Sequence, residues 1–68
     1  MTKQFVEKVI RNGIVDTKKY RYTTKEVNYY SEAKDAYIQE LHVVRLPLDL
    51  LDTTAALTEW ETVYIEEA

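Results

Sequence analysis

The side chains best suited to covalent chemistry are scarce in this chain. Ser31 is its only serine, His42 is its only histidine, and there is no cysteine. Nucleophilic catalysis needs a nucleophile, a base and an orienting group that converge in space. If Ser31 and His42 share one helix, the helical rise places them about 16 Å apart. They cannot form a dyad, so we interpret Ser31 as a helix cap and His42 as a surface residue, and we expect no enzymatic activity.

Acidic pairs such as Asp49/Asp52 and Glu59/Glu61 have the chemistry for acid–base catalysis or for binding a hard cation. A calcium loop needs acids at alternate positions around a glycine, and the single glycine, Gly13, is remote from these pairs. A glycine-rich phosphate loop is absent as well. The sequence therefore predicts no catalytic residue, no metal ligand and no cofactor, and these acids are interpreted as a solvated face.

A short basic and aromatic segment has the composition of a single-strand nucleic-acid binder. Cations that contact phosphates alternate there with rings that stack on bases, in the order Lys18, Lys19, Tyr20, Arg21, Tyr22. The competing interpretation is an exposed strand with lysines protecting its edge and tyrosines packed beneath. A net charge of −3 lacks the broad positive footprint of an autonomous nucleic-acid binder, so nucleic acid is the alternative partner here.

Charge is distributed unevenly along the chain. Residues 1–45 carry all nine Lys and Arg, whereas residues 46–68 carry six acids and no base. Aromatic rings are embedded in this acidic segment, and such rings are enriched at binding hot spots. The segment therefore predicts docking on a basic surface of a protein partner through Asp49, Asp52, Glu59, Trp60, Glu61, Tyr64 and Glu66.

Length and composition indicate one small domain, 1–68. It has neither disulfides nor a zinc-ligand pattern, which favours a homodimer or an obligate partner. No apolar run approaches a membrane span, and the amino terminus lacks the apolar core of a secretion signal, so a cytoplasmic protein without membrane contact is expected. We therefore expect a non-enzymatic binding module or modulator, of the kind that phages and mobile elements encode as accessory or inhibitory proteins.

One helix is predicted to organise the fold. Ser31 is its expected N-cap, Ala33, Tyr37, Ile38, Leu41 and Val44 form an apolar stripe at helical spacing, and Pro47 ends it by about Arg45. Acids in its first turn and cations near its end agree with the helix dipole.

Residues 2–22 admit two interpretations. As a hairpin, Phe5–Arg11 pairs with Ile14–Tyr20 across a type I′ turn at Asn12-Gly13. As a helix, the same segment is capped by Thr2 and closed by Gly13. We favour the hairpin, because Val, Ile, Thr and Tyr dominate residues 5–30.

The remaining segments favour strands. Partial alternation over residues 20–30 predicts a long strand, or two short ones, over a rival helix that starts at Thr23. Residues 59–66 alternate in the same way and predict a last strand. The expected fold is α+β: a small antiparallel sheet, made of the N-terminal hairpin and the C-terminal strand, with the main helix across one face.

Overall fold

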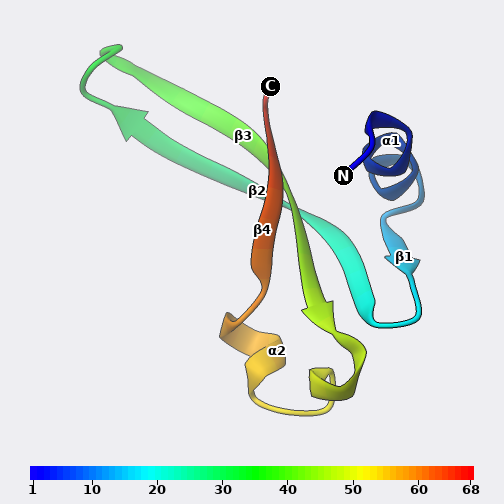
Figure 1. Cartoon of the computed structure of the whole chain (residues 1–68). Coiled ribbons are helices and arrows are strands. Elements are labelled where there is room, and N and C mark those ends of the chain that lie inside the picture. Colours follow the sequence, from blue (N-terminus) through cyan, green and yellow to red (C-terminus); the bar gives the residue numbers. More distant parts are fainter.

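A computed structural model describes residues 1–68 and shows a four-stranded sheet with one main helix. The elements in chain order are α1 (Lys3–Asn12), β1 (Ile14–Asp16), β2 (Tyr20–Ser31), β3 (Ala36–Pro47), the 3₁₀ turn η1 (Leu48–Leu50), α2 (Ala55–Thr58) and β4 (Glu61–Glu67). The strands form an antiparallel meander in the order β1-β2-β3-β4 (Figure 1). The predicted α+β class, with one main helix and a C-terminal strand, is confirmed.

The amino-terminal segment is a helix, so the favoured hairpin across Asn12-Gly13 is wrong and the alternative is correct. The Thr2 hydroxyl accepts a hydrogen bond from the Phe5 N–H at 3.1 Å and caps the first turn. At the other end, Gly13 has φ 83° and donates its N–H to the Val9 carbonyl at 2.7 Å. A positive φ costs little at glycine, which is why the helix ends there.

Tertiary packing explains why the helix prevails. Val6 and Val9 are spaced for one helix face, and they are buried in a cluster with Tyr22 of β2 and Val43 of β3. Most helical stability in proteins comes from such packing of an apolar face, and here it outweighs the strand preference of valine.

The helix predicted over residues 31–45 is wrong, because this region forms the turn and second strand of a β2–β3 hairpin. All twelve residues of β3 pair with β2, from Tyr20 opposite Pro47 to Ser31 opposite Ala36. The Ser31 hydroxyl does accept from an amide three residues later, that of Lys34 at 3.3 Å, but this bond closes a turn instead of capping a helix. The long strand predicted from Tyr20 is confirmed, and the rival helix at Thr23 is wrong.

The two faces of the sheet have different environments. We call the face covered by α1 the helix face and the opposite one the open face. Since side chains alternate along a strand, Tyr22 and Val43 lie on the helix face, and Thr23 and Val44 lie on the open face.

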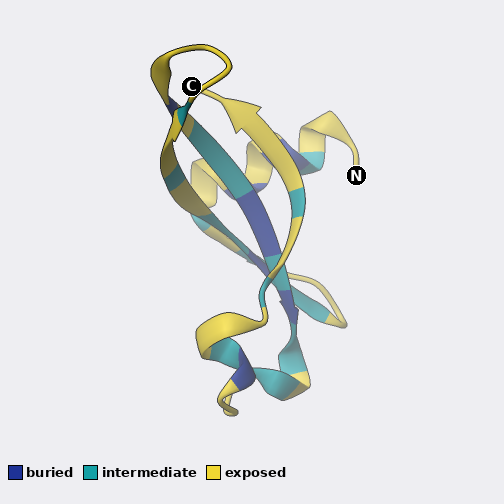
Figure 2. Ribbon diagram, turned by 90° about the vertical axis from the view of Figure 1, so that its left-hand side faces the viewer, coloured by how far each residue is buried: buried dark blue, intermediate teal, exposed yellow.

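Buried residues lie mainly in a narrow band along the middle of the sheet and on the side of α1 that packs against it, and one more, Ala55, lies in α2. Only eight residues are buried, and Val9, Val43 and Leu46 are the largest side chains that are fully enclosed. Figure 2 shows this band running along the middle of the hairpin, with most of β4 and the hairpin turn exposed. The molecule measures 41 × 29 × 16 Å, and the end of the β2–β3 hairpin extends away from α1 (Figure 1).

We expect Val9→Ala to lower the free energy of unfolding by roughly 2 kcal/mol, because it removes two buried carbons and leaves a cavity at the helix–sheet contact. Urea denaturation measures the change. Lys8→Ala, on the exposed side of the same helix, is the control and should change stability by less than about 0.5 kcal/mol. Equal effects of the two substitutions would contradict the observed packing of α1.

Candidate interaction surface

Strand β4 forms an open edge of the sheet. It is the last strand in the order β1-β2-β3-β4 and pairs with β3 alone. None of the backbone hydrogen bonds made outside the regular elements involves residues 61–67. An edge strand of this kind presents unpaired N–H and C=O groups that can template another strand.

The register identifies which backbone groups of β4 face outward. The Ala68 N–H donates to the Gln39 carbonyl at 2.9 Å, so these residues form a hydrogen-bonded pair. Hydrogen-bonded pairs alternate with non-bonded pairs along an antiparallel ladder. Glu66 and Tyr64 therefore point their backbone groups inward to β3, and Ile65 and Glu67 point theirs outward.

The side chains of β4 divide between the two faces. The register shifts between Val43 and Val44, and Val63 packs against the core on the helix face. From the pairing, Glu61, Tyr64 and Glu66 also lie on the helix face, and Thr62, Ile65 and Glu67 lie on the open face. Tyr64 and Ile65 are 36% and 53% exposed, so the centre of the strand offers apolar surface to a partner.

Two of the acids on β4 are compensated by cations within the chain. Arg45 Nε lies 3.0 Å from Glu61 Oε2, and Lys34 Nζ lies 3.3 Å from Glu67 Oε1. Glu66 is exposed, and so is Glu59, which lies two residues before β4 begins. The carboxylates of both residues make no hydrogen bond or ion pair. The outer surface of β4 is therefore net negative.

Arg45 connects β4 to the core. Its guanidinium lies 4.2 Å from the centroid of the Tyr20 ring, and Nη1 donates to the Tyr22 hydroxyl at 3.4 Å. Hydrogen bonds with Tyr22 and Glu61 both raise the pKa of Arg45 above its ordinary value. A permanently charged group thus holds the start of β4 in place.

The predicted partner-binding acids do not form one patch. Asp49 lies in η1 and lines a hollow together with Lys18 and Lys19, so this acid is close to the basic residues of the amino-terminal half. Asp52 and Glu59 lie in the segments before and after α2. Of the predicted set, the structure brings Glu61, Tyr64 and Glu66 together on one side of β4.

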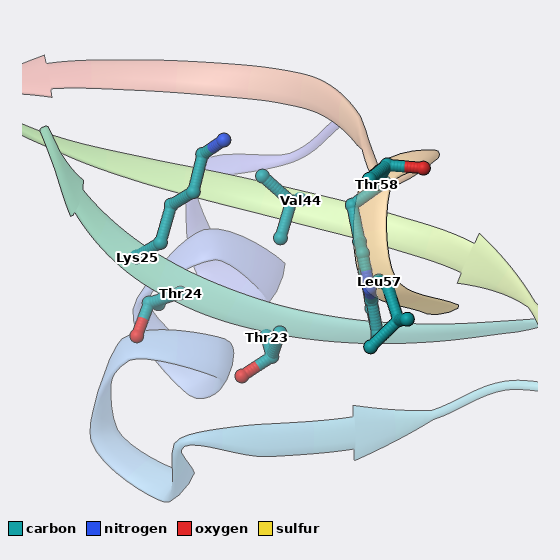
Figure 3. Close-up of a pocket in the computed structure, with 7 residues that line it drawn as sticks. Thr23, Thr24, Lys25, Val44, Leu57 and Thr58 are labelled. Atoms are coloured by element: carbon teal, nitrogen blue, oxygen red, sulfur yellow. The ribbon is translucent and has the colours of Figure 1, made fainter. Parts of the chain in front are cut away.

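Trp60, also predicted at the interface, is half-buried next to the open face. Its indole N–H donates to the Ala56 carbonyl at 2.7 Å. Together with Leu57 of α2, Trp60 lines a pocket of about 240 Å³ over Lys25 and Val44 (Figure 3). Leu57 is 81% exposed, and sequence reasoning did not include it.

The basic and aromatic segment Lys18 to Tyr22 is divided by the fold. Tyr22 is buried, with its ring centroid 4.8 Å from that of Phe5, and Tyr20 is covered by Arg45. Arg21 forms two hydrogen bonds with Asp16, at 2.8 and 3.0 Å, which lower the pKa of Asp16. Lys18 and Lys19 remain exposed, and their use in nucleic-acid binding stays a prediction.

A group of exposed tyrosines lies on the projecting part of the β2–β3 hairpin. The rings of Tyr30 and Tyr37 meet edge to face at 5.3 Å, and Tyr37 is 84% exposed. Hydrogen bonding to Asp35 raises the pKa of Tyr30. The sequence predicts Tyr37 on the apolar stripe of a helix, and this prediction is wrong, because residues 36–47 form β3.

A row of hydrogen-bonded polar side chains crosses the open face of the hairpin. The Tyr29 hydroxyl donates to Glu40 Oε2 at 3.1 Å, and His42 Nε2 lies 2.9 Å from Glu40 Oε1. His42 Nδ1 is buried without a hydrogen-bond partner. The hydrogen bond from His42 holds the pKa of Glu40 below its ordinary value. Glu40 therefore stays ionised although it is half-buried.

Ser31 and His42 are far apart, although they do not share a helix. Ser31 pairs with Ala36, and six residues of strand then lead to His42, a distance of about 20 Å by the strand rise. They form no dyad. No group of three or more His, Asp or Glu side chains is arranged to hold a metal ion.

Known proteins provide no family for this chain. Neither a family model nor a curated protein matches the sequence, and no solved structure matches the fold. No helix of the structure is long and apolar enough to cross a membrane. Function is therefore inferred from the exposed groups, charge and shape of the molecule itself.

The lowered pKa of Glu40 predicts a stability change in acid. As pH falls, the unfolded chain takes up this proton near the ordinary value of 4.5, before the folded protein does. The stabilisation is therefore present above that pH and is lost as pH falls through the lowered folded value. Glu40→Gln should make the dependence of unfolding free energy on pH shallower in this range, as measured by denaturation at several pH values.

Glu32→Gln is the matched control for this experiment. Glu32 is exposed in the hairpin turn, and its carboxylate makes no hydrogen bond or ion pair. It should keep the acid dependence of the parent protein. Parallel curves for the Glu40 variant and the parent would show that the contact with His42 does not stabilise the fold.

Proposed function

We propose that this protein is a non-enzymatic protein-binding module that holds a basic partner against the acidic outer surface of β4. The observation that carries the proposal is the open edge of β4, where unpaired backbone groups, exposed apolar side chains and the uncompensated carboxylate of Glu66 occur together. An open edge with exposed apolar side chains can pair with other chains, so natural proteins either protect such an edge or use it for binding.

Charge supports a basic partner over an acidic or neutral one. Complementary potentials accelerate encounter and reject partners of the wrong sign. Glu59 and Glu66 lack a cation of their own and are free to pair with lysine or arginine of a partner. Tyr64 and Ile65 precede Glu66 on β4, one on each face of the sheet, and supply the apolar contact that charged pairs alone do not give.

The proposal extends to the setting of the protein. A chain of 68 residues with a small core fits an accessory or inhibitory protein of a phage or mobile element, acting in the cytoplasm on a larger protein. Because the core is small, the protein would gain stability from its partner, since a partner that binds only the folded state raises its apparent stability.

Charge reversal tests this function. Glu59→Lys combined with Glu66→Lys should remove the partner recovered from the native host by affinity capture and mass spectrometry. With the purified partner, we expect affinity to fall by about tenfold or more, and the remaining binding to depend less on salt.

Glu7→Lys combined with Glu32→Lys is the control, because it makes the same change in net charge at exposed acids of α1 and of the turn between β2 and β3. This variant should retain the partner. Loss of binding in both double variants would indicate a nonspecific charge effect, and retention in both would contradict a role for the acidic surface of β4. Recovery of nucleic acid in place of a protein would also overturn the proposal.

A further inference from the structure

We infer that the partner binds as an extended segment that adds a fifth strand to the sheet, alongside β4. This inference rests on the proposed function and specifies how the basic partner is held. In strand addition, backbone hydrogen bonds along a sheet edge supply affinity, and alternate side chains supply specificity.

The backbone of β4 is arranged for such an addition. The pairing with β3 directs the N–H and C=O groups of Ile65 and Glu67 away from the sheet. The helix α1 packs mainly on β1, β2 and β3, and on β4 the inner Val63 is the residue that packs against the core cluster. Figure 2 shows most of β4 exposed along its length.

The side chains of β4 define the sequence that would fit beside it. Glu66 stands uncompensated near the end of the strand, and Glu61 and Glu67 remain 59% and 57% exposed beside their own cations, so acids flank the exposed Tyr64 and Ile65 on both sides. Opposite charges and apolar pairs stabilise neighbouring strands when they face each other. The occupant is therefore a segment with lysine or arginine at both ends and apolar residues in the middle.

A second copy of this chain fits the edge poorly. Antiparallel self-pairing centred on the middle of β4 would place Glu61 opposite Glu66 or Glu67 of the other copy. Like charges directly opposite each other are destabilising. The same acids that attract a basic segment thus act against self-association through this edge.

The sheet has a second open edge, which serves as an internal comparison. The short β1 pairs with Arg21, Tyr22 and Thr23, so β2 has no outer neighbour from Thr24 onward. This unpaired part of β2 carries one cation, Lys25, and one acid, Glu26, so its charges cancel. A basic segment is therefore expected at β4 and not at β2.

The test uses a synthetic peptide as long as β4, with lysines at both ends and valines in the middle, and the whole protein labelled with ¹⁵N. Binding should slow hydrogen exchange of the Ile65 and Glu67 amides and leave those of residues 24–31 unchanged. A second peptide of the same sequence, with N-methyl groups on alternate backbone nitrogens, keeps the charge but cannot pair with the edge. Its affinity should be lower by about tenfold or more.

A pair of variants tests the same contact from the side of the protein. Ile65→Pro removes an outward N–H without removing a bond to β3, and proline is tolerated on edge strands in such positions. Ile65→Ala keeps the N–H and shortens the side chain. The proline variant should bind the peptide about tenfold more weakly than the alanine variant, with the fold of both checked by amide spectra.

The outcomes separate this inference from the proposed function. If charge reversal at Glu59 and Glu66 abolishes partner binding, but both peptides bind equally and the amides of Ile65 and Glu67 stay unprotected, strand addition is overturned and the acidic binding surface stands. Protection of the β2 edge would also overturn it, as would failure of the unmodified peptide to bind at low salt. Protection at β4, lost with the methylated peptide, supports it.

Discussion

The contact between α1 and the centre of the β2–β3 hairpin is the constraint on which the structure depends. Val6, Val9, Tyr22 and Val43 meet there, and they are four of the eight buried residues. A chain of this size buries only about 60% of its unfolded surface, so one such contact accounts for much of the available apolar burial. Because α1 covers the middle of the sheet, the hairpin end and β4 depend on strand pairing and local polar contacts for their position.

Arg45 extends this constraint to β4. It lies over the Tyr20 ring, donates a hydrogen bond to the Tyr22 hydroxyl beside the core, and also pairs with Glu61. A guanidinium can make such contacts at once because its planar group offers several donors and also stacks on rings. The position of the open edge is therefore coupled to the core, which gives a binding strand a defined neighbour to pair with.

The sequence predicted the class of fold and two of the strands, but it misplaced the helix. Aromatic and β-branched residues are frequent between Tyr20 and Ser31, and again between Glu61 and Glu67. These residue types favour strands, and the apolar residues of these two segments fit a helical spacing poorly. Residues 36–47 fit both periods, because Tyr37, Leu41 and Val44 are helically spaced and Ile38, Val43 and Val44 favour strands. Local pattern could not decide between them. The decision comes from β2, a long strand that needs a partner of equal length, and from Val6 and Val9 of α1, which need a sheet to pack on.

The candidate site was predictable in its charge and not in its location. The sequence separates bases from acids along the chain, but the meander returns them to each other: Asp49 lies near Lys18, Glu61 pairs with Arg45, and Glu67 pairs with Lys34. These pairings depend on turns and on the register shift opposite Val43, which no composition reveals. The charge available to a partner is what remains after pairing. On the open edge the unpaired charge is that of Glu66, which lies beside the outward backbone groups of Ile65 and Glu67. A basic strand could use the charge and the backbone groups together, whereas an acidic segment without an open edge would offer the charge alone.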